Sequence, residues 1–121
     1  MRLFALRGAI SVQRNTAQDI LEATAELMRD LIARNELVPE RVVSCIFTAT
    51  DGLDAEFPAV AARELGFDAV PLLCARELPV PGSMPNVIRV LIHYYAPEQH
   101  VPAHSYLREA RALRADLSAA Q

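Results

Sequence analysis

The sequence offers arginines and one well-placed carboxylate as its main chemical groups. Arg7, Arg63 and Arg89 lie at the edges of, or inside, the regular segments that the sequence predicts. Guanidinium groups bind carboxylates through paired hydrogen bonds, so a cluster of the three would suit a carboxylate-bearing ligand. Arg89 is the strongest candidate, because it interrupts the run Val-Ile-Arg-Val-Leu-Ile, where a charge is costly unless it is paired. Taken singly, Arg7 and Arg63 are more often surface arginines or members of structural ion pairs.

Three further side chains could meet the same ligand. Glu77 follows a predicted strand and could bind a hydroxyl or act as a base, although a solvated loop carboxylate is the simpler interpretation. Cys74 has no base supplied by the sequence, so we expect a packed thiol and no covalent catalysis. Tyr106 could donate a hydrogen bond to a ligand carboxylate, although a core or interface tyrosine is more common.

Metal and nucleotide chemistry find no support in the sequence. His100 and His104 have a spacing that suits a metal on a helix, but Pro102 lies between them and breaks that geometry. The acidic residues from 51 to 56 lack the pattern of a calcium loop. No glycine-rich phosphate loop, nucleotide fingerprint or G-x-S-x-G motif is present. We therefore expect neither a metal nor a cofactor.

Strands and helices alternate along the chain, which is typical of α/β layers. Thr16 offers a helix N-cap, and Pro58 and Gly66 bracket a shorter helix. Apolar, β-branched runs predict the strands, and the proline-rich segment from 78 to 85 cannot continue one. The predicted elements are a strand over 2–10, a helix from Thr16 to about Arg34, a strand over 42–49, a helix over 59–65, a strand over 69–74 and a strand over 87–95.

The segment from His104 to Arg114 supports two interpretations. Leu107, Ala110, Leu113 and Leu117 recur at helical spacing, and the local composition favours a helix. Alternation of residues from Tyr106 onward permits a strand instead.

Composition bounds the class of protein. The chain has 121 residues, 52% of them hydrophobic and 22% charged, which fits one domain over 1–121 and suggests some closure of surface in an oligomer. The net charge of -3 argues against a nucleic-acid or anionic-membrane surface. No signal segment or run of about 20 apolar residues is readable. Two distant cysteines, Cys45 and Cys74, fit a reducing cytoplasm.

Taken together, these residues resemble the AroH-class chorismate mutases over nearly the whole chain. The pieces that carry the resemblance, in chain order, are Leu6-Arg7-Gly8-Ala9-Ile10, Phe57-Pro58-Ala59, Arg63-Glu64-Leu65, Val70-Pro71, Cys74-Ala75-Arg76-Glu77, Ile88-Arg89-Val90, His104-Ser105-Tyr106-Leu107 and Leu113-Arg114. The resemblance implies a mixed β-sheet packed with helices, assembled as a pseudo-barrel homotrimer. It also implies a strand at Tyr106 and beyond, which we adopt because tertiary pairing often overrides propensity.

The resemblance also implies the reaction and the site. Members of that family rearrange chorismate to prephenate, on the route to phenylalanine and tyrosine, without a cofactor. Arg89 would stabilise the ether oxygen, Arg7 and Tyr106 would grip a carboxylate, and Glu77 with the Cys74 region would meet the ring hydroxyl. The catalytic set is Arg7, Glu77 and Arg89, and the implied substrate-binding residues are Arg7, Phe57, Ala59, Arg63, Leu72, Leu73, Cys74, Glu77, Arg89, Tyr106 and Leu113. These sites would lie between subunits, with Phe57, Ala59 and Arg63 on one side and Arg7, Glu77, Arg89 and Tyr106 on the other.

Two positions depart from the family, and two other functions remain open. Val60 stands where some relatives carry a lysine at the mouth of the cleft, so the electrostatics of substrate entry are expected to differ. Leu73 stands where some relatives carry a threonine, so recognition of the substrate hydroxyl is expected to differ. A trimeric module that binds a metabolite without catalysis would keep the same fold. A purely structural domain would instead pair Arg89 with a carboxylate of its own chain.

Overall fold

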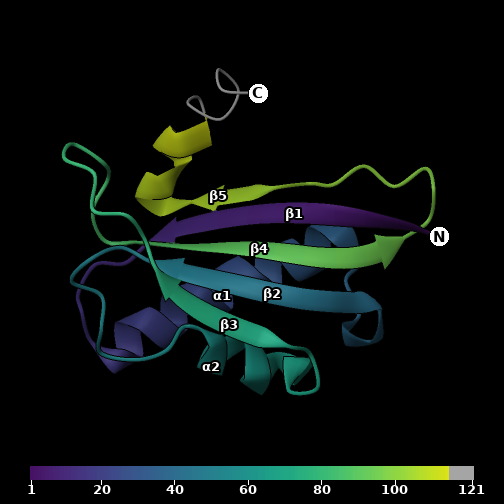
Figure 1. Cartoon of the computed structure of the whole chain (residues 1–121), viewed down its shortest axis with the longest axis horizontal. Helices are drawn as coiled ribbons and strands as arrows, with labels where there is room; N and C mark the ends of the chain where they lie inside the picture. Colours follow the sequence, from purple (N-terminus) through teal and green to yellow (C-terminus); the bar gives the residue numbers. More distant parts are fainter. Residues whose placement is uncertain (115–121) are drawn as a thin grey trace.

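The computed structural model describes residues 1–114 and forms one five-stranded mixed sheet with helices packed on it (Figure 1). The strands lie in the order β3-β2-β4-β1-β5. Strand β4 runs antiparallel to both of its neighbours, whereas the β2–β3 and β1–β5 pairs are parallel. The regular elements are β1 (Arg2–Ser11), α1 (Ala17–Asn35), a 3-10 turn (Pro39–Arg41), β2 (Val42–Ala49), α2 (Ala59–Ala62), a wide helical turn (Arg63–Phe67), β3 (Leu72–Arg76), β4 (Val87–Ala96), β5 (Ser105–Leu107) and a 3-10 helix (Arg108–Ala112). The mixed α/β fold expected from the sequence is confirmed.

The helices cover one face of the sheet. Thr16 caps α1, because its hydroxyl accepts a hydrogen bond from the Asp19 N–H at 3.0 Å. The apolar side of α1, including Leu27 and Leu31, packs with α2 on the sheet face that carries Leu6, and all of these side chains are buried. Among the helices of residues 1–114, none is long and apolar enough to cross a membrane.

The third predicted strand and the short helix are shifted from their expected positions. Helix α2 ends at Ala62 and continues as the wide turn through Phe67, where Gly66 adopts a left-handed φ of 97°. A positive φ favours glycine and stops the helix there, as the sequence predicted. The chain then needs residues up to Pro71 to reach the sheet, so β3 spans Leu72–Arg76 and not the predicted 69–74.

The segment from His104 to Arg114 contains a short strand followed by a short helix. Ser105–Leu107 forms β5 beside β1, which confirms a strand at Tyr106. The strand does not continue beyond Leu107, because Arg108 has a left-handed φ of 55° and begins the 3-10 helix. The expectation of a strand beyond this point is therefore wrong, and Leu117 lies outside the described residues.

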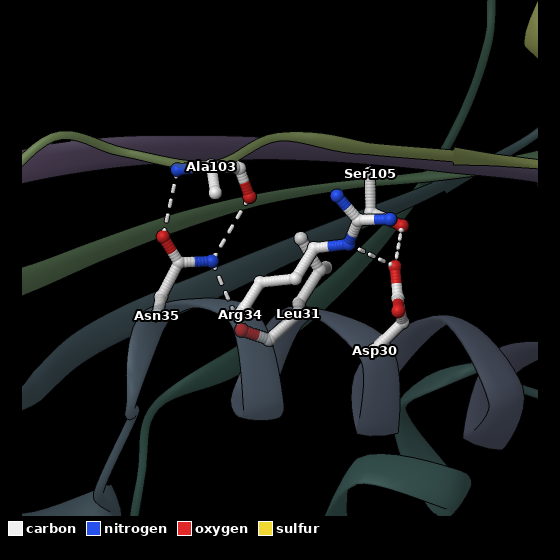
Figure 2. A network of polar contacts seen from close by, with 6 residues as sticks. All are labelled: Asp30, Leu31, Arg34, Asn35, Ala103 and Ser105. Carbon is white, nitrogen blue, oxygen red and sulfur yellow. Dashed lines mark hydrogen bonds and ion pairs between the residues drawn. The ribbon is translucent and has the colours of Figure 1, made fainter.

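Polar contacts from α1 fix the connection that leads into β5 (Figure 2). The buried side-chain amide of Asn35 donates to the carbonyl oxygen of Ala103 at 2.9 Å, and its oxygen accepts from the Ala103 N–H at 2.8 Å. One turn earlier, the Asp30 carboxylate accepts hydrogen bonds from Ser105 and from Arg34. The segment that leads into β5 is thereby held at one position along α1, from which it is distant in sequence.

Neither α1 nor α2 covers the opposite face of the sheet, although the 3-10 helix packs on one end of it, where Ala110 is buried with Ala9 and Val87. Strand alternation and register place Arg7, Thr48, Leu73, Arg89 and Tyr106 on this open face. It also carries apolar side chains, of which Leu3, Leu73 and Tyr95 are exposed. We call this surface the open face below.

Gly8 gives a test of the packing on the covered face. A Cβ atom at this position would lie 2.8 Å from Leu31 Cδ1 and 3.1 Å from Leu27 Cδ1, so Gly8→Ala must displace these buried leucine side chains. We expect the free energy of unfolding to fall by about 1–3 kcal/mol, as overpacking usually costs. Urea unfolding at matched protein concentration measures this change, and an unaltered midpoint would contradict it.

Candidate active site

One row of side chains crosses all five strands on the open face. The register aligns Tyr106 of β5 with Ala9 of β1, then with Arg89 of β4, Thr48 of β2 and Ala75 of β3. Ala9, between Tyr106 and Arg89 in this row, is fully buried in a cluster with Val87 and Ala110. Four residues of this row, Tyr106, Ala9, Arg89 and Thr48, line one groove.

Arg89 is paired within its own chain. Its Nε lies 3.1 Å from Glu77 Oε1 and 3.0 Å from Glu77 Oε2. Glu77 comes directly after β3 and reaches Arg89 across β2, where the Thr48 hydroxyl donates to Oε2 at 2.6 Å. The carboxylate is thus anchored by a neutral donor and a charged one, which compensates the guanidinium in this apolar strand.

The pairing leaves part of Arg89 available. Within residues 1–114 its side-chain hydrogen bonds all run through Nε, and the side chain is 34% exposed. Arg89 lines a groove of about 430 Å³ together with Arg7, Thr48 and Tyr106. The intramolecular partner required for a purely structural domain is present, but so is an open cavity that Arg89 lines. We call this cavity the arginine groove.

Several cations surround the phenol in this groove. Burial raises the pKa of Tyr106, while the charges of Arg7, Arg89 and Arg114 act in the opposite direction. The phenol therefore remains protonated at neutral pH and can donate a hydrogen bond. The guanidinium of Arg7 makes no ion pair with any residue of the described part of the chain. The groove is suited to an anion.

A second groove holds the other predicted residues. Phe57, Ala59, Arg63, Leu72, Leu73 and Cys74 line a cavity of about 510 Å³. Phe57 and Leu73 are largely exposed there, at 65% and 60%, and Arg63 has no ion pair with residues 1–114. This cavity, which we call the Phe57 groove, shares no lining residue with the arginine groove. One chain therefore presents two grooves with different lining residues.

Leu113 and Val60 line neither groove. Leu113 packs against a small buried cluster that includes Ala9, and Tyr106 packs against the same cluster. Val60 is partly buried on α2, next to Ala59, and lines neither groove.

Three residues near the arginine groove were not predicted as site residues from the sequence. Thr48 anchors Glu77, and the alternation of β2 with its neighbours gave no sign of that contact. His104 accepts a hydrogen bond from the main chain of Arg7, 97 residues away. Arg114 contributes to the positive charge at Tyr106.

The family model for chorismate mutase type I matches residues 3–117. The chain belongs to this family. It is 48% identical over 119 residues to chorismate mutase AroH of Thermus thermophilus, covering 96% of this chain and 97% of that protein. It is 39% identical over 121 residues to chorismate mutase AroH of Bacillus subtilis, covering 98% and 94%. A solved chorismate mutase from Clostridium thermocellum superposes with a TM-score of 0.86 at 39% identity, covering 90% of this chain and 98% of that one.

The two cysteines should react very differently with a thiol reagent. Cys45 is buried, and burial raises its pKa to about 12, so its thiolate is scarce and inaccessible. Cys74 is partly exposed in the Phe57 groove. We expect iodoacetamide at mildly alkaline pH to label Cys74 alone, as measured by peptide mass spectrometry.

The matched control is Cys74→Ser, which should remove the label altogether. Rapid modification of Cys45 in the folded protein would contradict the burial described above. Chorismate added beforehand should slow labelling of Cys74 if the Phe57 groove binds it.

Proposed function

We propose that this chain catalyses the rearrangement of chorismate to prephenate, in sites built from the arginine groove of one subunit and the Phe57 groove of the next. The observation that carries the proposal is that Arg89 is both paired with a carboxylate and open to a cavity. Its Nε is held by Glu77, while the residue also lines an open cavity on the open face and its terminal nitrogens make no hydrogen bond with residues 1–114. Such a group is fixed in position yet can still donate to a ligand.

The reaction needs charge stabilisation and little else. As the ether C–O bond of chorismate stretches, its oxygen gains negative charge before the new carbon–carbon bond closes. A guanidinium stays protonated throughout and, when held in advance, can donate to that oxygen without reorganising. Because the charge develops only in the transition state, this contact lowers the barrier more than it tightens substrate binding.

The remaining residues would bind the carboxylate and hydroxyl groups of the substrate. Arg7 and the protonated Tyr106 would bind a carboxylate in the arginine groove, and Arg63 would face the substrate from the neighbouring subunit. Glu77 Oε1 accepts only one described hydrogen bond, so it retains a lone pair for the ring hydroxyl. Holding the flexible enolpyruvyl arm over the ring would supply a further part of the rate.

A homotrimer would bring the two grooves together. Each chain carries both grooves, and their linings have no residue in common. The apolar side chains of the open face, such as Leu3 and Tyr95, would also be covered by neighbouring subunits. A cyclic arrangement of three chains repeats one such contact and gives equivalent sites.

We further propose a cytoplasmic location and a single domain over 1–121. Cys45 and Cys74 are both free thiols, which suits a reducing compartment. Prephenate made there would enter the biosynthesis of phenylalanine and tyrosine.

The loss of chorismate absorbance on adding purified protein tests the activity, and Arg89→Ala tests its mechanism. We expect kcat to fall by about 10²–10³-fold, as removal of a preorganised donor to a developing oxyanion does. Arg29→Ala is the control, because Arg29 is an exposed arginine on α1 that lines neither groove. Turnover in Arg89→Ala equal to that of the control would refute the role given to Arg89.

Mixing two inactive variants tests the site between subunits. Arg63→Ala removes a cation from the Phe57 groove, and Arg89→Ala removes one from the arginine groove. If each site takes one groove from each of two chains, every mixed trimer contains one site in which both arginines are intact. Equimolar refolding of the two variants should then recover about a quarter of the wild-type activity.

Each variant refolded alone serves as the control and should remain inactive. A mixture no more active than its components would place both arginines in the site of a single chain. The mass of the assembly, from light scattering, should equal three chains of 13.3 kDa.

A further inference from the structure

The pairing of β1 with β5 ends next to Arg7. Backbone pairing joins Gly8–Ile10 to Ser105–Leu107 and stops there. One residue earlier, the Arg7 N–H points at the partner strand and donates to Nδ1 of the His104 ring at 3.0 Å. An imidazole thus takes the place that a backbone carbonyl would hold in a longer strand pair.

The residues on both sides of His104 in the chain are held by hydrogen bonds to α1. Ala103 is held by the two hydrogen bonds to the Asn35 side chain. Ser105 is held by its hydroxyl contact with the Asp30 carboxylate, as Figure 2 shows. Because α1 secures both sides of His104, the ring is a rigid acceptor for the main chain of β1.

The ring can accept this bond only in one protonation state. Nδ1 has a lone pair when the proton lies on Nε2, whereas a protonated ring carries a hydrogen on both nitrogens. His104 is exposed overall, and partial desolvation of its ring, followed by the charge of Arg7, lowers its pKa from the ordinary value. The bond is therefore intact at neutral pH and is lost as the pH falls through the lowered pKa.

The surrounding charged and titratable groups come from three elements. Arg7 on β1 is the cation that acts on His104, and Tyr106 follows it on β5. On α1, the Asp30 carboxylate is engaged by Ser105 and Arg34. Protonation of His104 would thus place a second cation beside Arg7 at the same time as it removes the acceptor.

We propose that His104 is a positioning residue for the arginine groove: its neutral imidazole fixes the main chain of Arg7 and so sets the guanidinium beside Tyr106. The effect on catalysis rests on the proposed function, because it concerns the grip of Arg7 on a substrate carboxylate. The hydrogen bond itself does not rest on that function, and the two can be tested separately.

Steady-state kinetics with His104→Ala and His104→Asn test the positioning role. The alanine variant removes the acceptor, and we expect kcat/KM to fall by about tenfold or more, as small misplacements of a binding group do. Most of this loss should appear in KM, since Arg7 binds a carboxylate in the ground state and transition state alike. The asparagine variant offers an oxygen at the place of Nδ1 and should restore most of the activity.

The pH profile separates positioning from a structural contribution. Wild-type kcat/KM should decline below about pH 6.5 in part through His104, and His104→Asn should lose that part because an amide does not titrate. His100→Asn is the matched control: His100 lies in the same connection but bonds Tyr94 and lines neither groove. An acid limb that is the same in all three proteins would overturn the proposal.

Amide proton shifts give a readout that does not depend on activity. The Arg7 N–H resonance should move with pH as His104 titrates, and the movement should be absent in His104→Asn and present in His100→Asn. If it is absent in the wild type, the hydrogen bond does not exist and the inference fails. If it is present while the protein leaves chorismate unchanged, the inference about Arg7 stands and the proposed function fails.

Discussion

A charged guanidinium in the middle of an apolar strand needs an oxygen from the fold, and the arrangement of this sheet meets that need. Arg89 lies on β4, the central antiparallel strand, with apolar residues on both sides of it in sequence. The oxygen comes from Glu77, which reaches over β2 from the end of β3 and is steadied there by Thr48. Without that contact, the desolvation of Arg89 would be uncompensated. With it, the guanidinium is fixed while its terminal nitrogens remain available.

The two faces of the sheet serve different purposes. On the covered face, Gly8 allows the leucines of α1 to approach β1 closely, and this packing supplies the apolar burial that stabilises the chain. The open face keeps its polar row because neither α1 nor α2 lies over it. Stability is thus concentrated on one side, which leaves the other side free to bind a ligand and neighbouring chains.

Local patterns predicted the elements well, and longer-range contacts less well. The amphipathic helix from Thr16 and the strand around Arg89 followed from periodicity and β-branched composition. The start of β3 was misplaced because the distance from Gly66 back to the sheet depends on packing, which no local pattern records. The end of β5 was misplaced because the left-handed φ of Arg108 has no sequence signal in arginine.

The same division applies to the site. Arginine in an apolar run was informative by itself, since its cost implies a partner or a ligand. That Arg7, Arg89 and Tyr106 lie together, and Arg63 apart from them, was expected only from the family resemblance, because it depends on the register between strands and no local pattern records it. Thr48 and His104 were missed because each acts through a residue distant in the chain.

The parallel pairing of β1 with β5 has a consequence for biosynthesis. Arg7 and its partner His104 are 97 residues apart in the chain. The four strands β1 to β4 can pair before β5 has been synthesised, but the edge that carries Tyr106 cannot join them until then. A nascent chain therefore exposes the edge of β1 until β5 has been made, and a chain that lacks β5 would keep an edge open to pairing with other chains.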